Sequence, residues 1–243
     1  MSLWAQTSGT VVNVLAVLLG SVLGLALRRR LPTRTVTTVM QAIGLTTVFI
    51  GIASAWDLTR VDDPPGVIVA LLGLAIGGVI GEALGIERGL DALGERLKRR
   101  FRGSGRFTEG FVTATLLFCV GPLTLIGAIQ NGLVGDADFL LLKSALDGLS
   151  ALALSTTFGI GVMASVIVIA VYQGGLSLAA GLLSGWLPDP ATDPRVLLVG
   201  GVGGLMIVGL GLGLLELVKV RVASMLPALV VVVPLWWALG RLL

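Results

Sequence analysis

Long apolar runs separated by short polar segments dominate the pattern of this chain. Several of these runs reach the length of about 18 residues or more that an α-helix needs to cross a bilayer. The pattern predicts an all-α, polytopic transmembrane bundle with about eight spans, at roughly 9–28, 35–56, 66–86, 108–134, 139–158, 160–186, 195–217 and 222–240. We expect one integral membrane domain over residues 1–243, because these spans use most of the length.

Basic residues are concentrated in three of the predicted connections. These residues are Arg28, Arg29, Arg30 and Arg34 after the first span, Arg88, Arg96, Lys98, Arg99, Arg100, Arg102 and Arg106 after the third, and Lys219 and Arg221 before the last. The remaining connections are acidic or nearly neutral, and an eight-span arrangement puts all three basic connections on one side. Since loops rich in Lys and Arg stay in the cytoplasm, we expect both termini to be external.

Residues 87–106 form a connection with a helical pattern of their own. Apolar residues recur there at helical spacing opposite the basic ones, at Leu90, Leu93, Leu97 and Phe101. We predict a short amphipathic helix on the inner, cytoplasmic surface of the bilayer. A solvated linker is the alternative, because Gly89 and Gly94 weaken a helix.

Composition agrees with a membrane protein and narrows the chemistry. Only 13% of the residues are charged, against about 25% in soluble domains. The chain has no histidine and one cysteine, Cys119, which excludes an internal disulfide and a metal site built from several Cys or His ligands. We predict no cofactor and no nucleic-acid partner, since the basic clusters lie beside spans. We predict no enzyme, since no nucleophile–base pair is recognisable.

Small residues recur at four-residue steps in two spans. Gly73, Gly77, Gly81 and Gly85 do so in the third, and Ala16, Gly20 and Gly24 in the first. Small residues at this spacing let helix backbones approach closely. We expect them to pack helices, within one chain or between copies, and we favour a homo-oligomer. A permeation path lined by backbone is the alternative.

Two charged residues lie inside the fifth span, where charges are costly. Lys143 and Asp147 are four residues apart and share a face with small and polar residues. They lie about 7 Å and 13 Å from the expected helix start, at 1.5 Å per residue. Three interpretations stay open: a buried pair that fixes packing, a site that contacts an ion or solute, and a pair that snorkels to the surface.

Further polar side chains are candidates for the same region. They are Asn13 in the first span, Gln130 and Asn131 at the end of the fourth, and Gln173 in the sixth. Each alone is typical of an interhelical hydrogen bond, and together they favour a shared polar cavity. Gly121 and Pro122 are expected to break the fourth span, because proline lacks a backbone donor, and the carbonyl so freed is a candidate cation ligand.

Three stretches and a short opening motif carry a resemblance to a known family. They are FCVGPLTLIGAIQNGLVGD, LLLKSALDGLSALALSTTFGIGV and YQGGLSLAA, with the opening GTVVN at Gly9 to Asn13. They resemble the YqgA-like family of bacterial inner-membrane proteins, a domain of unknown function numbered 554. The resemblance implies a multi-pass protein of the bacterial inner membrane. It implies no substrate and no functional residues.

A broken span, intramembrane charges and a polar helix face favour a transporter or channel. We predict passage of a small ion or polar solute, with the polar site in the region of the fourth and fifth spans. The alternative is a structural or regulatory membrane protein whose buried charges only fix helix packing.

The predicted orientation can be tested with single cysteines in a Cys119→Ser background. We expect an impermeant thiol reagent applied to intact cells to label cysteines placed in 57–64 and to leave those in 88–106 unmodified, because basic connections are cytoplasmic. Labelling of the 88–106 connection from outside would contradict the orientation.

Overall fold

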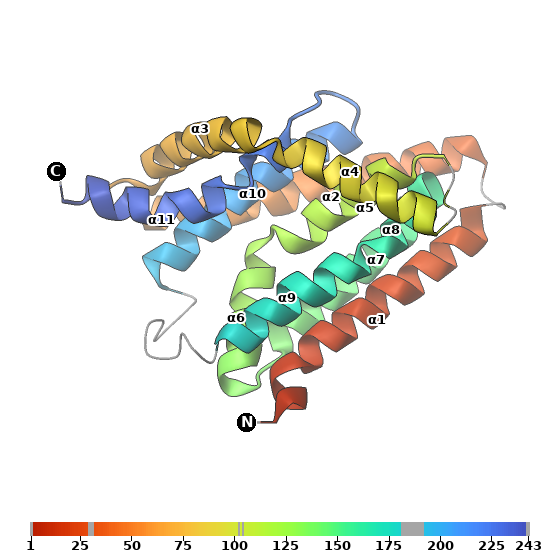
Figure 1. Cartoon of the computed structure of the whole chain (residues 1–243), viewed down its shortest axis with the longest axis horizontal. Helices are drawn as coiled ribbons and strands as arrows, with labels where there is room; N and C mark the ends of the chain where they lie inside the picture. The colour runs from red at the N-terminus through yellow and green to blue at the C-terminus, as the bar shows by residue number, and fades with distance from the viewer. Residues whose placement is uncertain (1, 29–31, 102, 104, 181–191, 242–243) are drawn as a thin grey trace. The chain divides into compact units, whose positions relative to one another are not determined.

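The computed structural model is helical along most of the chain (Figure 1) and describes residues 2–28, 32–101, 103, 105–180 and 192–241. The α-helices are α1 (Leu3–Arg28), α2 (Thr33–Ala55), α3 (Gly66–Leu84), α4 (Ile86–Arg100), α5 (Phe107–Cys119), α6 (Pro122–Val134), α7 (Asp138–Phe158), α8 (Ile160–Ala164), α9 (Val166–Ala180), α10 (Pro194–Leu214) and α11 (Ala228–Leu239). The 3-10 helices are η1 (Trp56–Arg60) and η3 (Val222–Met225).

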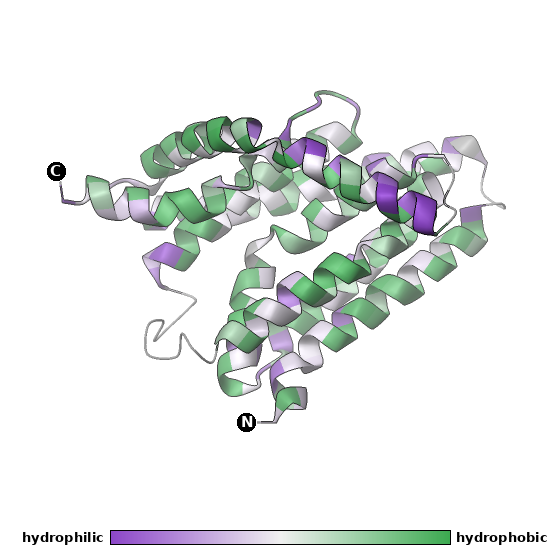
Figure 2. Ribbon diagram, in the orientation of Figure 1, coloured by the Kyte–Doolittle hydropathy of each residue, from purple (hydrophilic) through white to green (hydrophobic). Residues whose placement is uncertain are grey.

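These elements confirm the predicted all-α membrane bundle. Within the described ranges, 7 helical segments are long and apolar enough to cross a membrane, and the bent pair of α5 and α6 raises the number to 8. Hydrophobic residues follow the helices, whereas hydrophilic residues gather at helix ends and along α4 (Figure 2). The two helices of the pair are bent by 58°, and the break falls at Gly121 and Pro122.

The helices are grouped into two compact units. Unit 1 contains the described residues of Met1–Ile43, Asp91–Cys119 and Leu123–Pro188, and unit 2 those of Gly44–Leu90, Val120–Pro122 and Asp189–Leu243. Helix α2 begins in unit 1 and ends in unit 2, so the division does not separate consecutive stretches of chain. The single membrane domain expected from the sequence stays a prediction.

In unit 1, α1 and α7 lie side by side and run in the same direction (Figure 1). Gly9 lies against Leu140 and Gly24 lies against Leu152, so residue numbers increase in the same direction along the two helices. A methyl group at Gly24, or at Gly20, would overlap a backbone carbonyl of α7. The small residues of α1 therefore permit a close helix–helix contact, which stabilises association in lipid.

The broken pair α5–α6 crosses unit 1 from one end to the other. Gly110 of α5 lies against Phe158, the last residue of α7. Gly127 of α6 lies against Leu140, near the first turn of α7. A re-entrant loop would return to the end at which it entered, so these contacts are those of one broken span.

In unit 2, the glycine stripe of α3 packs against η3 and α11 of the same chain. Gly73, Gly77 and Gly81 face Val232, Ala228 and Ser224 in turn, which makes α3 and α11 antiparallel. Gly85 has a different role, because it ends α3 with a φ of 64°, in the left-handed region that glycine adopts without strain. The stripe that motivated a homo-oligomer is thus covered within the chain, and the homo-oligomer itself stays a prediction.

The connection between α3 and α5 contains the predicted amphipathic helix, α4. Gly94 lies against Thr108 and Phe111 of α5, and Leu97 packs on the same apolar cluster. Thr108 Oγ1 donates a hydrogen bond to Glu95 (2.5 Å), which holds the pKa of that carboxyl below its usual range. Part of the apolar side of α4 therefore rests on α5, while its basic residues Arg96, Arg99 and Arg100 are exposed.

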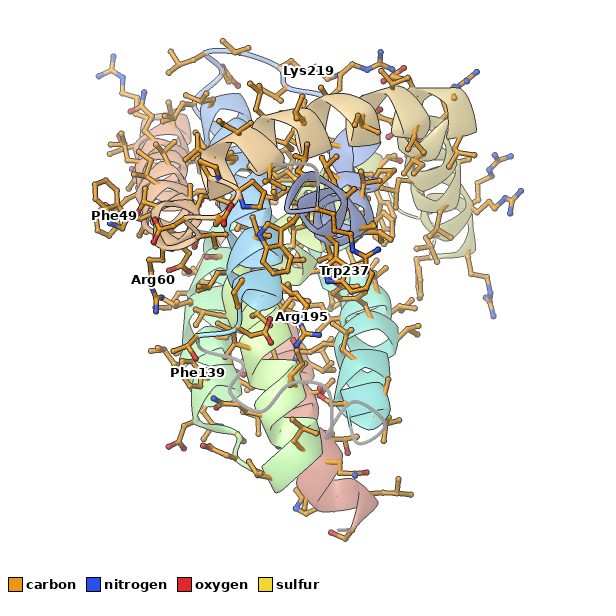
Figure 3. All side chains as sticks on the ribbon, turned by 90° about the vertical axis from the view of Figure 1, so that its left-hand side faces the viewer. Phe49, Arg60, Phe139, Arg195, Lys219 and Trp237 are labelled. Carbon is orange, nitrogen blue, oxygen red and sulfur yellow. The ribbon has the colours of Figure 1, made fainter. Side chains whose placement is uncertain are left out.

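Large apolar side chains of unit 2 point outward (Figure 3). Phe49 of α2 is 72% exposed and Trp237 of α11 is 60% exposed. Arg195 and Lys219 lie towards opposite ends of α10 in the same view. Apolar side chains along the flanks and charged ones near the helix ends are typical of helices that span a bilayer.

Substitution of Gly81 tests the contact between α3 and η3. A methyl group at Gly81 would overlap the Ser224 carbonyl, whereas one at Gly78, a turn away on the same helix, meets nothing within 4 Å. We expect Gly81→Ala to lower the melting temperature in detergent by several degrees. Gly78→Ala is expected to leave it unchanged or raise it, because alanine favours a helix by about 1 kcal/mol over glycine. Equal melting of both variants would contradict this packing.

Candidate functional site

Five polar side chains of unit 1 form a buried network between α1, α7 and α9, which we call the central network. Its members are Thr10 and Asn13 of α1, Lys143 and Asp147 of α7, and Gln173 of α9. None is more than 7% exposed. The structure therefore brings together four of the six residues that the sequence predicted to converge.

An unbroken series of hydrogen bonds joins the five members. Lys143 Nζ donates to Asp147 Oδ2, and Asn13 Nδ2 donates to the same oxygen at 3.0 Å. Asn13 Nδ2 also donates to Gln173 Oε1 at 2.9 Å, and Gln173 Nε2 donates to Thr10 Oγ1 at 3.3 Å. Asn13 thus connects the ion pair of α7 to α9.

Local sequence and packing explain why these side chains meet. Lys143 and Asp147 are one helical turn apart, and Thr10 and Asn13 are three residues apart, so each pair shares a helix face. The short side chains of Asn13 and Asp147 reach each other because glycines bring α1 close to α7. The charges of the network sum to zero, which lowers the cost of keeping it out of water.

One acceptor of the central network is left without a partner. Asn13 Oδ1 is buried and has no hydrogen bond with any described residue. The amide cannot simply be turned over, because its nitrogen already donates to two acceptors, Asp147 Oδ2 and Gln173 Oε1. A buried acceptor without a partner costs about 1–3 kcal/mol. The network therefore has room in its hydrogen bonding for one further donor or cation.

Asn131 lies in a separate contact towards the start of α1. Its Oδ1 accepts from the backbone N–H of Gly9 (3.2 Å), and its Nδ2 donates to the carbonyl of Ala5 (2.9 Å). In an α-helix, the N–H of one residue bonds the carbonyl of the residue four positions earlier, and these two backbone groups are such a pair. Asn131 thus fastens α6 to α1. Gln130 is half-buried beside it and has no hydrogen bond to the central network in the described part of the chain.

The break in the fourth span was expected to leave a backbone carbonyl without a hydrogen bond, but this carbonyl has a partner. Pro122 lacks the N–H that a continuous helix would direct to the carbonyl of Phe118. Thr124 Oγ1 donates to that carbonyl instead, at 3.1 Å. The carbonyl that we considered as a cation ligand therefore already has a partner.

The described residues include one cysteine and no cluster of metal-ligating side chains. Across the described residues, no group of three or more His, Cys, Asp or Glu side chains is placed to hold a metal ion. Cys119 is a buried free thiol at the end of α5.

Thr10 is the member of the central network that the sequence interpretation missed. A threonine in a helix commonly bonds the backbone of its own helix, so it gives no signal as an interhelical partner. Its position three residues before Asn13, on the same face, is the signal that would have found it.

Comparison with known proteins places the chain among membrane proteins. Residues 8–237 match the family described as "Protein of unknown function (DUF554)". The chain is 29% identical to "Uncharacterized membrane protein YdfK" of Bacillus subtilis, over 92% of this chain and 93% of that protein. It is 32% identical to "Uncharacterized protein YqgA" of Escherichia coli, over 93% of this chain and 95% of that protein. No solved structure matches it.

Proposed function

The chain belongs to the DUF554 family, and we propose that this membrane protein is a transporter or channel for a small ion or polar solute. The solute contacts the central network, where Lys143 and Asp147 form its charged part. The bilayer is that of the bacterial inner membrane, a proposal supported by the bacterial origin of both relatives.

The free acceptor of Asn13 is the observation that carries this proposal. A network built only to fix helix packing would be expected to use all of its buried polar atoms, because each unused one is costly in a water-free interior. Asn13 Oδ1 stays unused, although the nitrogen of the same amide bonds the Asp147 carboxylate. A solute that offers a donor or a positive charge would satisfy it.

With a zwitterionic solute, the ion pair can exchange partners without leaving a lone buried charge. When a solute enters, Lys143 can pair with a negative group and Asp147 with a positive one, in place of pairing with each other. Because the charges of the pair cancel, a neutral or zwitterionic polar solute leaves the total unchanged. A single ion adds one charge, and the partner that it displaces then has to find another contact.

A purely structural role is the second candidate, and burial favours it. Lys143 is 4% exposed and Asp147 is 7% exposed, so the pair is sealed between helices in this structure. Such a pair would hold α7 in register with α1 and α9. Both roles need the pair for stability, and only the first needs it for passage of a solute.

Three variants separate these roles when stability and flux are measured together. Lys143→Met and Asp147→Asn should each destabilise the protein by about 3–5 kcal/mol, because each leaves an uncompensated buried charge. The double variant should recover much of this loss, and melting in detergent measures it. Flux into liposomes should be lost in the double variant, with radiolabelled sodium, rubidium, chloride, glycine and glycerol as the probes.

The matched control is the exposed pair Arg60 and Asp57, whose nearest charged atoms are 3.1 Å apart. Removing this pair should change stability by about 0.2–1 kcal/mol or less and leave flux intact. A double variant of Lys143 and Asp147 that is folded and moves solute like the unsubstituted protein would refute the site. Failure of the unsubstituted protein to move any probe would refute transport of these solute classes.

A further inference from the structure

Five buried hydroxyl oxygens of unit 1 have no hydrogen bond with any described residue, those of Thr157 and Ser177 among them. The other three belong to three different helices. They are Ser21 on α1, Thr115 on α5 and Ser155 on α7, and they are 0%, 5% and 0% exposed. None of their oxygens has a hydrogen bond with any described residue. We call them the hydroxyl layer.

Some buried hydroxyls of the same unit bond the backbone of their own helix. Ser144 donates to the carbonyl of Leu140 (2.5 Å), and Thr156 donates to that of Ala153 (2.7 Å). A serine or threonine inside a buried helix commonly satisfies itself in this way, on its own backbone. The members of the hydroxyl layer do not bond their own backbone in this way.

The three residues lie at about the same level of the unit. Ser21 and Ser155 are each eight residues beyond a member of the central network, Asn13 and Asp147, on parallel helices. Eight residues correspond to about 12 Å along a helix. Gly24, one turn after Ser21, lies against Ser155.

Thr115 reaches this level from the opposite direction. Helix α5 runs against α7, and its Gly110 lies beside Phe158. Five further residues place Thr115 about 7.5 Å back along α7, within a turn of Ser155. The hydroxyl layer therefore lies between the central network and the C-terminal end of α7.

We propose that water molecules bond these hydroxyls and form a path from the central network to the C-terminal end of α7. Buried water commonly satisfies polar groups that the protein leaves unpaired, and it needs two to four polar partners. The hydroxyl layer offers three oxygens, and Asn13 Oδ1 offers a fourth at the network end of the path.

The far end of the path is polar as well. The Arg28 guanidinium lies beside Gly159, where α7 ends. A cation at this place is favourable, since the C-terminus of a helix carries partial negative charge. The path would thus lead from the buried ion pair to a charged helix end.

The role that we give this path rests on the proposed function, whereas the presence of the path does not. A carrier needs its site to reach water from one side at a time, and a path on one side of the central network provides that. The Asn131 contact with Ala5 and Gly9 closes α6 onto α1 at the other end of the helix. One more unpaired hydroxyl, Ser177 of α9, lies on that side.

Cysteine reactivity tests the path without any solute. In a Cys119→Ser background, Thr115→Cys and Ser155→Cys place a thiol in the path. The matched controls are Ala114→Cys, one residue from Thr115, and Ala153→Cys, two residues from Ser155; these alanines are buried, 0% and 7% exposed. The probe is 2-aminoethyl methanethiosulfonate, which reacts with the thiolate in contact with water. Mass spectrometry of the protein in liposomes measures the labelling rates.

We expect the two cysteines of the path to react at least tenfold faster than their controls. Equal, slow labelling of all four in folded protein would overturn the path. Water-to-protein magnetisation transfer in solid-state NMR gives the same comparison without substitution: Thr115 and Ser155 should receive it, and Ala114 and Ala153 should not. Rapid labelling in a protein that moves no solute would keep the path and refute transport, so the two proposals fail separately.

Discussion

The scarcity of hydrogen-bonding partners inside a bilayer is the constraint on which unit 1 depends. A charge there is tolerated only with an opposite charge and further polar contacts around it. Asp147 has Lys143 on its own helix and Asn13 on α1, and Asn13 in turn holds Gln173 of α9. The Asp147 carboxylate and the Asn13 amide together therefore connect three helices.

Small residues make this arrangement possible. Asparagine and aspartate have short side chains, so they meet only where two helix backbones approach closely. Gly20 and Gly24 let α1 lie directly on carbonyls of α7, and Gly9 makes room for Leu140. Glycines also permit close packing in unit 2, where Gly77 contacts the start of α11 and Gly81 contacts the segment before it. Packing and polar chemistry are thus linked in unit 1, since the glycine contact positions the ion pair.

Helix positions and the ion pair were predictable from local pattern. Apolar runs locate the helices, Pro122 locates the break, and four-residue spacing pairs Lys143 with Asp147. Asn13 and Gln173 were candidates because an amide in a span needs a partner, but their mutual contact depends on which helices are neighbours. The spacing of glycines from Gly73 to Gly81 is the same whether they pack on a helix of the same chain or on a second copy, so the sequence does not distinguish these cases. Ser21 and Thr115 gave no signal, because most such hydroxyls bond their own helix.

Thermal shift measures whether the central network holds a solute. A ligand that binds only the folded state adds about 2.7 kcal/mol at a concentration of 100 times its Kd. With the probe that crosses the liposome membrane fastest, the melting temperature of the unsubstituted protein should rise with probe concentration. That of the Lys143→Met, Asp147→Asn double variant should not change. Equal rises in both proteins would place the solute elsewhere and contradict the account.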